Sequence, residues 1–204
     1  RQRDAALLWF EVEQTALRLA FGTFIQLGCR YEIRRFALAL WPWWILRRKF
    51  REGRRWLKLA LDHSDAGDAD DLEQELLVAS GLLELYSGHR GAARTRAAAG
   101  AMPGLPGAQH DWRGASLGTL GLLAASENDW ERALGLYRIF LESTEPRSGT
   151  SSWFPHLRAV ICLASSAAYF ARSEIDEAEY HATVVLKDAL RLGDPMLVGY
   201  ARLH

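Results

Sequence analysis

Four small residues recur along the chain at nearly equal spacing, and they constrain its fold more than any other feature. The spacings are 40, 40 and 45 residues, and the residues are Gly53, Ala93, Ala133 and Ala178. Small residues at a fixed place in successive helix pairs are typical of stacked repeats, because two helices approach closely only where side chains are small. The sequence therefore predicts an all-α fold built from repeated antiparallel helix pairs.

Two further positions keep the same register. The residues seven positions after the small ones are Ala60, Gly100, Phe140 and Val185. The residues twelve positions before them are Trp41, Gly81, Gly121 and Ser166. This combination of small and bulky residues fits a helix crossing with larger side chains at its flanks.

Apolar periodicity and loop-forming residues give the expected boundaries. Gly28 ends the first helical segment, and Asn128 is expected to cap a helix that starts at Trp130. About nine or ten helices are predicted, with no strand. They form a single repeat domain over 1–204, divided into an N-terminal segment 1–28, helix pairs at 30–65, 68–101, 111–145 and 153–192, and the start of a further helix at 195–204.

The stretch from Leu40 to Leu61 holds half of the eight tryptophans and a dense run of cations. Its periodicity predicts a helix hairpin, with a bend near Pro42. Gly53 disfavours a helix by about 1 kcal/mol relative to alanine. Its place there predicts a close helix crossing.

Composition excludes a general affinity for polyanions. The 25 basic and 25 acidic residues cancel, although ten Lys and Arg lie between Arg30 and Lys58 and seven acids lie between Asp62 and Glu75. No apolar run reaches the roughly 18 residues of a membrane span, and no secretory signal is present. We therefore expect a cytoplasmic protein with no membrane partner, whose start and end suggest a piece of a longer chain.

The two cysteines, Cys29 and Cys162, are each flanked by apolar residues. Their wide separation suits a reduced compartment better than a disulfide framework. We expect both to be buried free thiols.

The repeat resembles the tetratricopeptide family, whose signature has a glycine in the first helix and alanines in the second. Gly121, Ala133 and Tyr137 match that signature in one unit, whereas Trp41 and Phe140 depart from it in others. The period also exceeds the family value of about 34. The resemblance implies a right-handed superhelix of helix pairs that binds proteins.

A narrower resemblance covers Asp4–Glu13 (DAALLWFEVE) and Leu38–Leu61. These segments are similar to the region that opens the C-terminal repeats of bacterial, actinobacterial-type STAND signalling ATPases, found with LuxR-type or antibiotic-regulatory-protein-type DNA-binding domains. The resemblance implies a repeat region that senses an inducer or partner and regulates oligomerisation in a transcription regulator. Because the chain contains no GxxxxGK[ST] phosphate loop, any ATPase would lie outside it.

The repeat register also predicts which residues face a concave groove. This candidate groove is mostly apolar and consists of Arg35, Leu38, Ile45, Leu46, Val78, Leu82, Leu85, Tyr86, Leu122, Leu163 and Phe170. Either it binds an apolar peptide, helix or small molecule, or a neighbouring helix fills it. The residues alone leave both alternatives open.

A candidate basic patch consists of Arg47, Arg48, Lys49, Arg51, Arg54 and Arg55. These cations could bind nucleic-acid phosphates or anionic lipid, with Trp43 or Trp56 stacking nearby. The preferred interpretation is a solvated hairpin turn paired with the acidic stretch 62–75, because a neutral chain lacks the one-signed field that such partners exploit.

No pattern predicts catalysis, a cofactor or a metal site. None of the six histidines forms an HxxxH or HExxH pattern, and Glu177 and His181 are expected to be a surface pair. The predicted function is a non-catalytic protein-interaction and ligand-sensing module of a transcription regulator. The alternatives are a stand-alone adaptor that binds a partner helix or peptide, and, less favoured, a nucleic-acid or membrane-surface binder. A protein or peptide partner, a small-molecule effector and self-association all remain open.

Overall fold

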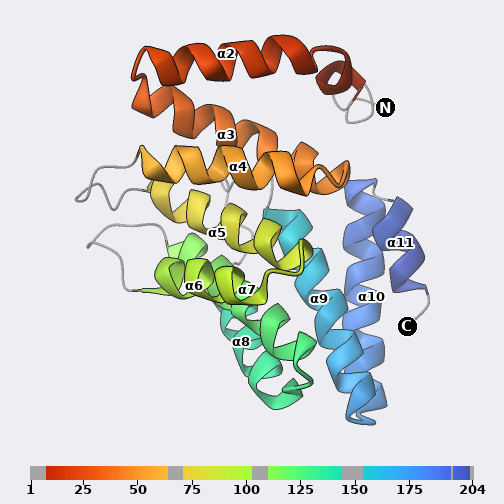
Figure 1. The fold of residues 1–204 in the computed structure, drawn as a ribbon. Coiled ribbons are helices and arrows are strands. Elements are labelled where there is room, and N and C mark those ends of the chain that lie inside the picture. Colours follow the sequence, from red (N-terminus) through yellow and green to blue (C-terminus); the bar gives the residue numbers. More distant parts are fainter. Residues whose placement is uncertain (1–7, 64–70, 103–109, 144–153, 194, 203–204) are drawn as a thin grey trace. The chain divides into compact units, whose positions relative to one another are not determined.

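The computed structural model describes residues 8–63, 71–102, 110–143, 154–193 and 195–202 (Figure 1). The described helices are α2 (Gln14–Gln26), α3 (Arg30–Leu46), α4 (Phe50–Asp62), α5 (Asp71–Tyr86), α6 (Arg90–Ala101), α7 (His110–Ser126), α8 (Trp130–Ser143), α9 (Phe154–Ala171), α10 (Ile175–Leu192) and α11 (Pro195–Ala201). No strand occurs within these described ranges. The all-α class predicted from the sequence is confirmed.

The chain divides into two compact units, 1–96 and 97–204. In the first unit, α3 packs against α2, α4 and α5, and α4 also packs against α5. In the second unit, α7 pairs with α8, α9 pairs with α10, and α11 packs against both α9 and α10. The expectation of a single repeat domain over 1–204 stays a prediction.

The same backbone turn joins the two helices of each predicted pair. Its central residue has a positive φ, and the N–H of that residue donates to the carbonyl three residues earlier. The N–H of the following residue donates to the carbonyl five residues before it, which completes the Schellman arrangement. The residues with positive φ at these turns are Arg48, Gly88, Asn128 and Ser173, and Gly28 forms the same turn between α2 and α3. Positions 48, 88, 128 and 173 keep the spacing of the small residues, so the repeat is a property of the backbone as well as of the sequence.

Asn128 does not cap α8 as predicted. It takes the left-handed conformation at the end of α7, with φ 62°. Asp129 is the cap, since its Oδ1 accepts a hydrogen bond from the backbone N–H of Arg132 at 3.3 Å. The sequence pattern placed the start of the helix well but assigned the capping side chain one residue too early.

All twelve residues of the predicted repeat register are buried. A Cβ on Gly53 would collide with the side chain of Leu83 and would lie 2.9 Å from Cβ of Trp44. A Cβ on Gly121 would lie 2.6 Å from Cε1 of Tyr137. The close helix crossing predicted at Gly53 is therefore confirmed, and Gly121 occupies a second crossing of the same kind.

Aromatic side chains dominate the core of the first unit. Trp41 and Trp44 are 1% and 0% exposed, and α3 continues through Pro42 to Leu46. Both cysteines are free, but only Cys162 is buried; Cys29 is half-buried, because it lies at the turn between α2 and α3. The prediction of two buried thiols is therefore wrong for Cys29. No described helix is long and apolar enough to cross a bilayer.

Candidate functional site

The structure divides the predicted groove residues into buried and accessible ones. Leu38, Val78 and Leu82 are buried in the helix-pair core, so they line no open surface. Their burial excludes an open binding surface at these three positions and agrees with the other alternative, in which a neighbouring helix fills this side, because α3 and α5 pack against each other. The accessible ones are Arg35, Tyr86 and Phe170, which are exposed, and Ile45, Leu46, Leu85, Leu122 and Leu163, which are half-buried.

The basic patch also divides into paired and unpaired cations. Arg47 Nε lies 3.0 Å from Glu11 Oε1, and Arg54 Nε lies 2.7 Å from Glu84 Oε2. Both partners lie outside the stretch 62–75, so the expected pairing with that stretch is wrong for these two arginines. Arg48, Arg51 and Arg55 make no ion pair within the part of the chain that the structure describes.

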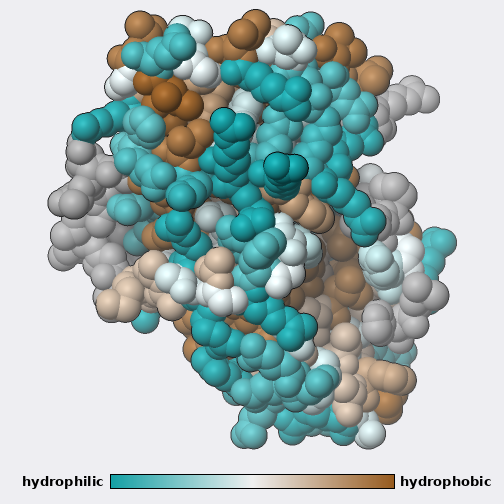
Figure 2. Space-filling model, in the orientation of Figure 1, coloured by the Kyte–Doolittle hydropathy of each residue, from teal (hydrophilic) through white to brown (hydrophobic). Residues whose placement is uncertain are grey.

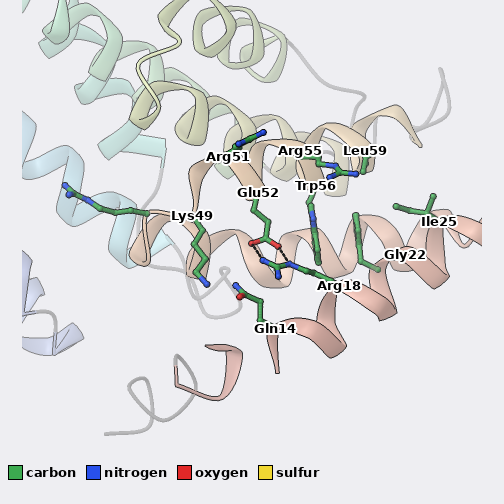
Figure 3. Close-up of a pocket in the computed structure, with 12 residues that line it drawn as sticks. Gln14, Arg18, Gly22, Ile25, Lys49, Arg51, Glu52, Arg55, Trp56 and Leu59 are labelled. Atoms are coloured by element: carbon green, nitrogen blue, oxygen red, sulfur yellow. Dashed lines mark hydrogen bonds and ion pairs between the residues drawn. The ribbon is translucent and has the colours of Figure 1, made fainter. Parts of the chain in front are cut away.

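These cations border a hollow between α2 and α4, shown in Figure 3. Its volume is about 730 Å³, within the range of small-molecule and peptide sites. We call it the cationic hollow; α2 contributes Gln14, Arg18, Phe21, Gly22 and Ile25, and α4 with its preceding turn contributes Arg48, Lys49, Arg51, Glu52, Arg55, Trp56 and Leu59. Five of these side chains are basic and one is acidic.

A two-point ion pair spans the hollow. Arg18 Nε donates to Glu52 Oε1 at 2.7 Å, and Arg18 Nη2 donates to Oε2 at 3.1 Å (Figure 3). The hydrogen bond from Arg18 to Glu52 raises the pKa of the Arg18 guanidinium. Arg18 therefore occupies the one carboxylate of the hollow, and the four remaining cations have no ion-pair partner among the residues that the structure describes.

The floor of the hollow is aromatic. The rings of Phe21 and Trp56 stack with centroids 4.2 Å apart, and Phe36 lies beside both. Phe21 covers one face of the Trp56 ring and Trp56 is only 8% exposed, which leaves little of the ring for the base stacking considered in the less favoured nucleic-acid alternative. Trp43, the other tryptophan considered, has the ammonium of Lys49 4.4 Å from its ring centroid.

The two helices that border the cationic hollow differ in surface hydropathy. Hydrophilic side chains gather along α4, beside hydrophobic side chains over α2 (Figure 2). The sequence identified the cations of α4. It missed Gln14, Arg18 and Glu52, because only the packing of α2 brings residues 14–25 next to residues 48–59.

A second cavity, of about 360 Å³, lies in the second unit among α8, α9 and α10. His181 stacks on Tyr169 with ring centroids 5.3 Å apart, so the predicted surface pair with Glu177 does not describe its surroundings. Burial lowers the pKa of His181 and favours its neutral imidazole. Elsewhere, no three His, Cys, Asp or Glu side chains of the described residues lie close enough to hold a metal ion.

The packed helix pairs and their repeated turns define an all-helical protein. No family model matches the chain, and no curated protein matches it. The fold is similar to the crystal structure of BtubC (BKLC) from P. vanneervenii, with a TM-score of 0.64, 14% sequence identity, and coverage of 90% of this chain and 78% of that chain. At this identity the similarity concerns the fold alone.

Proposed function

We propose that the chain is a non-catalytic helical-repeat module that binds protein partners. The observation that carries this proposal is the recurrence of one turn and one buried small residue at spacings of 40, 40 and 45 residues. Stacked helix pairs of this kind expose extended surfaces that suit partner binding. We further propose that the pairs form a right-handed, tetratricopeptide-like superhelix.

The proposed setting is the regulatory C-terminal part of a transcription regulator of the STAND type. It is supported by the resemblance of Asp4–Glu13 and Leu38–Leu61 to the region that opens the repeats of those proteins. Binding of a partner or effector would change the curvature or end-packing of the repeats, and so the association of the attached domains. These domains would lie outside this chain.

Sequencing the reading frame upstream of the codon for Arg1 tests this setting. A phosphate loop followed by a winged-helix domain supports the regulator. A reading frame without a phosphate loop overturns it and favours the second candidate, a stand-alone adaptor. The cationic hollow supports the adaptor as well as the regulator. All of its lining residues lie in the first unit, so a partner could bind there without any attached domain.

Light scattering of the isolated chain at low and high salt tests how the module works. A dimer that survives high salt would indicate that apolar surface mediates self-association, as a module that controls assembly requires. A monomer at all concentrations would contradict control by self-association and leave the surface for a different protein.

A further inference from the structure

Three cations along one side of the cationic hollow point to an extended anionic partner. Arg48 lies in the turn before α4, and Arg51 and Arg55 follow about one helical turn apart, roughly 6 Å at 1.5 Å per residue. All three side chains are exposed. A row of this length matches several negative groups along a chain better than one compact anion.

Positively charged side chains gather at the N-terminus of α4, where negative charge would stabilise the helix. Backbone N–H groups at a helix N-terminus favour anions, yet Arg48, Lys49 and Arg51 surround this one. Lys49 occupies the cap position without a capping hydrogen bond, and the acid of the first turn, Glu52, is bound to Arg18. By contrast, α10 has Asp176 and Glu177 in its first turn. An anion supplied by a partner would satisfy this end of α4.

Arg48 is also an uncommon residue for its backbone conformation. Its φ is 54°, and the equivalent turns contain Gly28, Gly88, Asn128 and Ser173, of which glycine and asparagine tolerate a positive φ more easily. A strained arginine on the rim of a binding hollow is consistent with a role for its side chain in recognition.

The apolar wall of the hollow distinguishes between kinds of anion. Gly22, Ile25 and Leu59 line it, with Leu59 next to Arg55 on α4 (Figure 3), and a Cβ on Gly22 would meet nothing within 4 Å. A nucleic-acid backbone of phosphates and sugars offers little apolar surface for such a wall, and the chain has a net charge of zero. An amphipathic helix with acids on one side offers both kinds of group.

From these observations we infer that the cationic hollow docks an acidic, amphipathic helical segment of a partner protein. Carboxylates of the partner bind Arg48, Arg51 and Arg55, and its apolar side chains lie against Gly22, Ile25 and Leu59. The inference rests on the proposed function, because it names the partner chemistry of a protein-binding module.

The test starts from a phage-displayed library of random 16-residue peptides selected on the full chain. Enriched peptides are synthesised with fluorescein, and their affinities are measured by anisotropy at low and high salt. We expect Asp and Glu interspersed with Leu, Ile or Phe at helical spacing, and binding that weakens as salt increases.

Two variants alter the hollow by independent means. Arg48→Glu/Arg51→Glu/Arg55→Glu reverses the charge of the row, and Gly22→Leu fills the open space without changing charge. Each is expected to weaken binding at least 10-fold. The control, Arg132→Glu/Lys187→Glu/Arg202→Glu, makes the same change of net charge at exposed residues of the second unit, and should leave affinity within about 2-fold. Circular dichroism checks that each variant keeps its helix content.

The outcomes separate the inference from the proposed function. Peptides that lack acids, or that bind the charge-reversed chain as well as the original, overturn the inference but leave a protein-binding module. A selection that enriches no peptide counts against both. Binding of a 30-nucleotide single-stranded DNA that the charge reversal abolishes would overturn the inference in favour of a nucleic-acid site.

Discussion

The rings of Phe21 and Trp56 are parallel, with centroids 4.2 Å apart and an interplanar angle of 1°. Phe21 is the buried residue of α2 and Trp56 is buried in α4, so this stack holds the two walls of the cationic hollow together. Trp56→Ala removes the stack and leaves a void in a closely packed interior, which typically costs about 3–5 kcal/mol. Urea unfolding should show that loss, whereas the exposed Lys58→Ala on the same helix should stay within about 0.5 kcal/mol. Equal effects of the two substitutions would mean that the stack contributes nothing.

Gly53 should be intolerant of even a methyl group. Alanine normally favours a helix over glycine by about 1 kcal/mol, but a Cβ at position 53 would lie 2.9 Å from Trp44, which cannot move aside. Gly53→Ala is therefore expected to destabilise the chain by about 1–3 kcal/mol. Gly22→Ala in α2 is the matched control, because its Cβ meets open space and should stabilise by about 0.5–1 kcal/mol. Denaturant unfolding of both variants would contradict the close crossing if their effects had the same sign.

Much of the fold could be predicted because its determinants are local or periodic. Gly28 and Gly193 mark helix ends by their positive φ, and Pro195 begins α11 as expected. The spacing of the small residues also identified which side of each helix is buried. These features depend on residues close in sequence or on an exact repeat, and no three-dimensional information is needed to find them.

The candidate site could be predicted only in part because it depends on packing between distant segments. The pairs Arg18–Glu52 and Arg54–Glu84 join residues 34 and 30 positions apart, and no periodicity relates their partners. A charge run indicates where cations lie, but not which of them acquire a carboxylate neighbour. The cationic hollow therefore emerges only when α2 is placed beside α4.

The turns between helices offer a test of backbone strain. Gly88 has φ 80° and no atom within 4 Å of a built Cβ, so Gly88→Ala should lose stability through conformation alone, by about 1–2 kcal/mol. Ser173 has φ 64° in the equivalent turn, so Ser173→Gly should gain up to about 1 kcal/mol. Thermal unfolding should show opposite shifts in Tm for the two variants. Shifts in the same direction would mean that φ at these turns does not limit stability.

Glu75 should make stability depend on pH near neutrality. Burial raises the pKa of its carboxyl from 4.5 to about 7, and Arg35 opposes that rise. Because the folded pKa lies above the unfolded one, the folded chain binds more protons between pH 4.5 and 7. Its stability therefore falls as pH rises through this range.

Glu75→Gln keeps a neutral side chain and should remove this fall. Relative to the variant, the wild type should lose roughly 1–2 kcal/mol between pH 5 and pH 8, allowing for the exposed part of the side chain. Urea unfolding at both pH values measures the difference. Glu32→Gln on an exposed position of α3 should keep the wild-type pH dependence; if both variants behave alike, the effect does not come from Glu75.

The two cysteines should differ sharply in reactivity. Cys162 is 2% exposed, and burial raises its pKa to about 11 against the opposing charge of Arg158. At pH 8 its thiolate population is then about 100-fold smaller than that of an ordinary thiol. Burial also keeps reagents away from its sulfur. Half-buried Cys29 should react with an aromatic disulfide reagent in a fast phase, and Cys162 should react only after unfolding in guanidinium chloride. Cys29→Ser should abolish the fast phase and leave the slow one. A fast phase that survives in that variant would mean that α9 opens at Cys162 in the native chain.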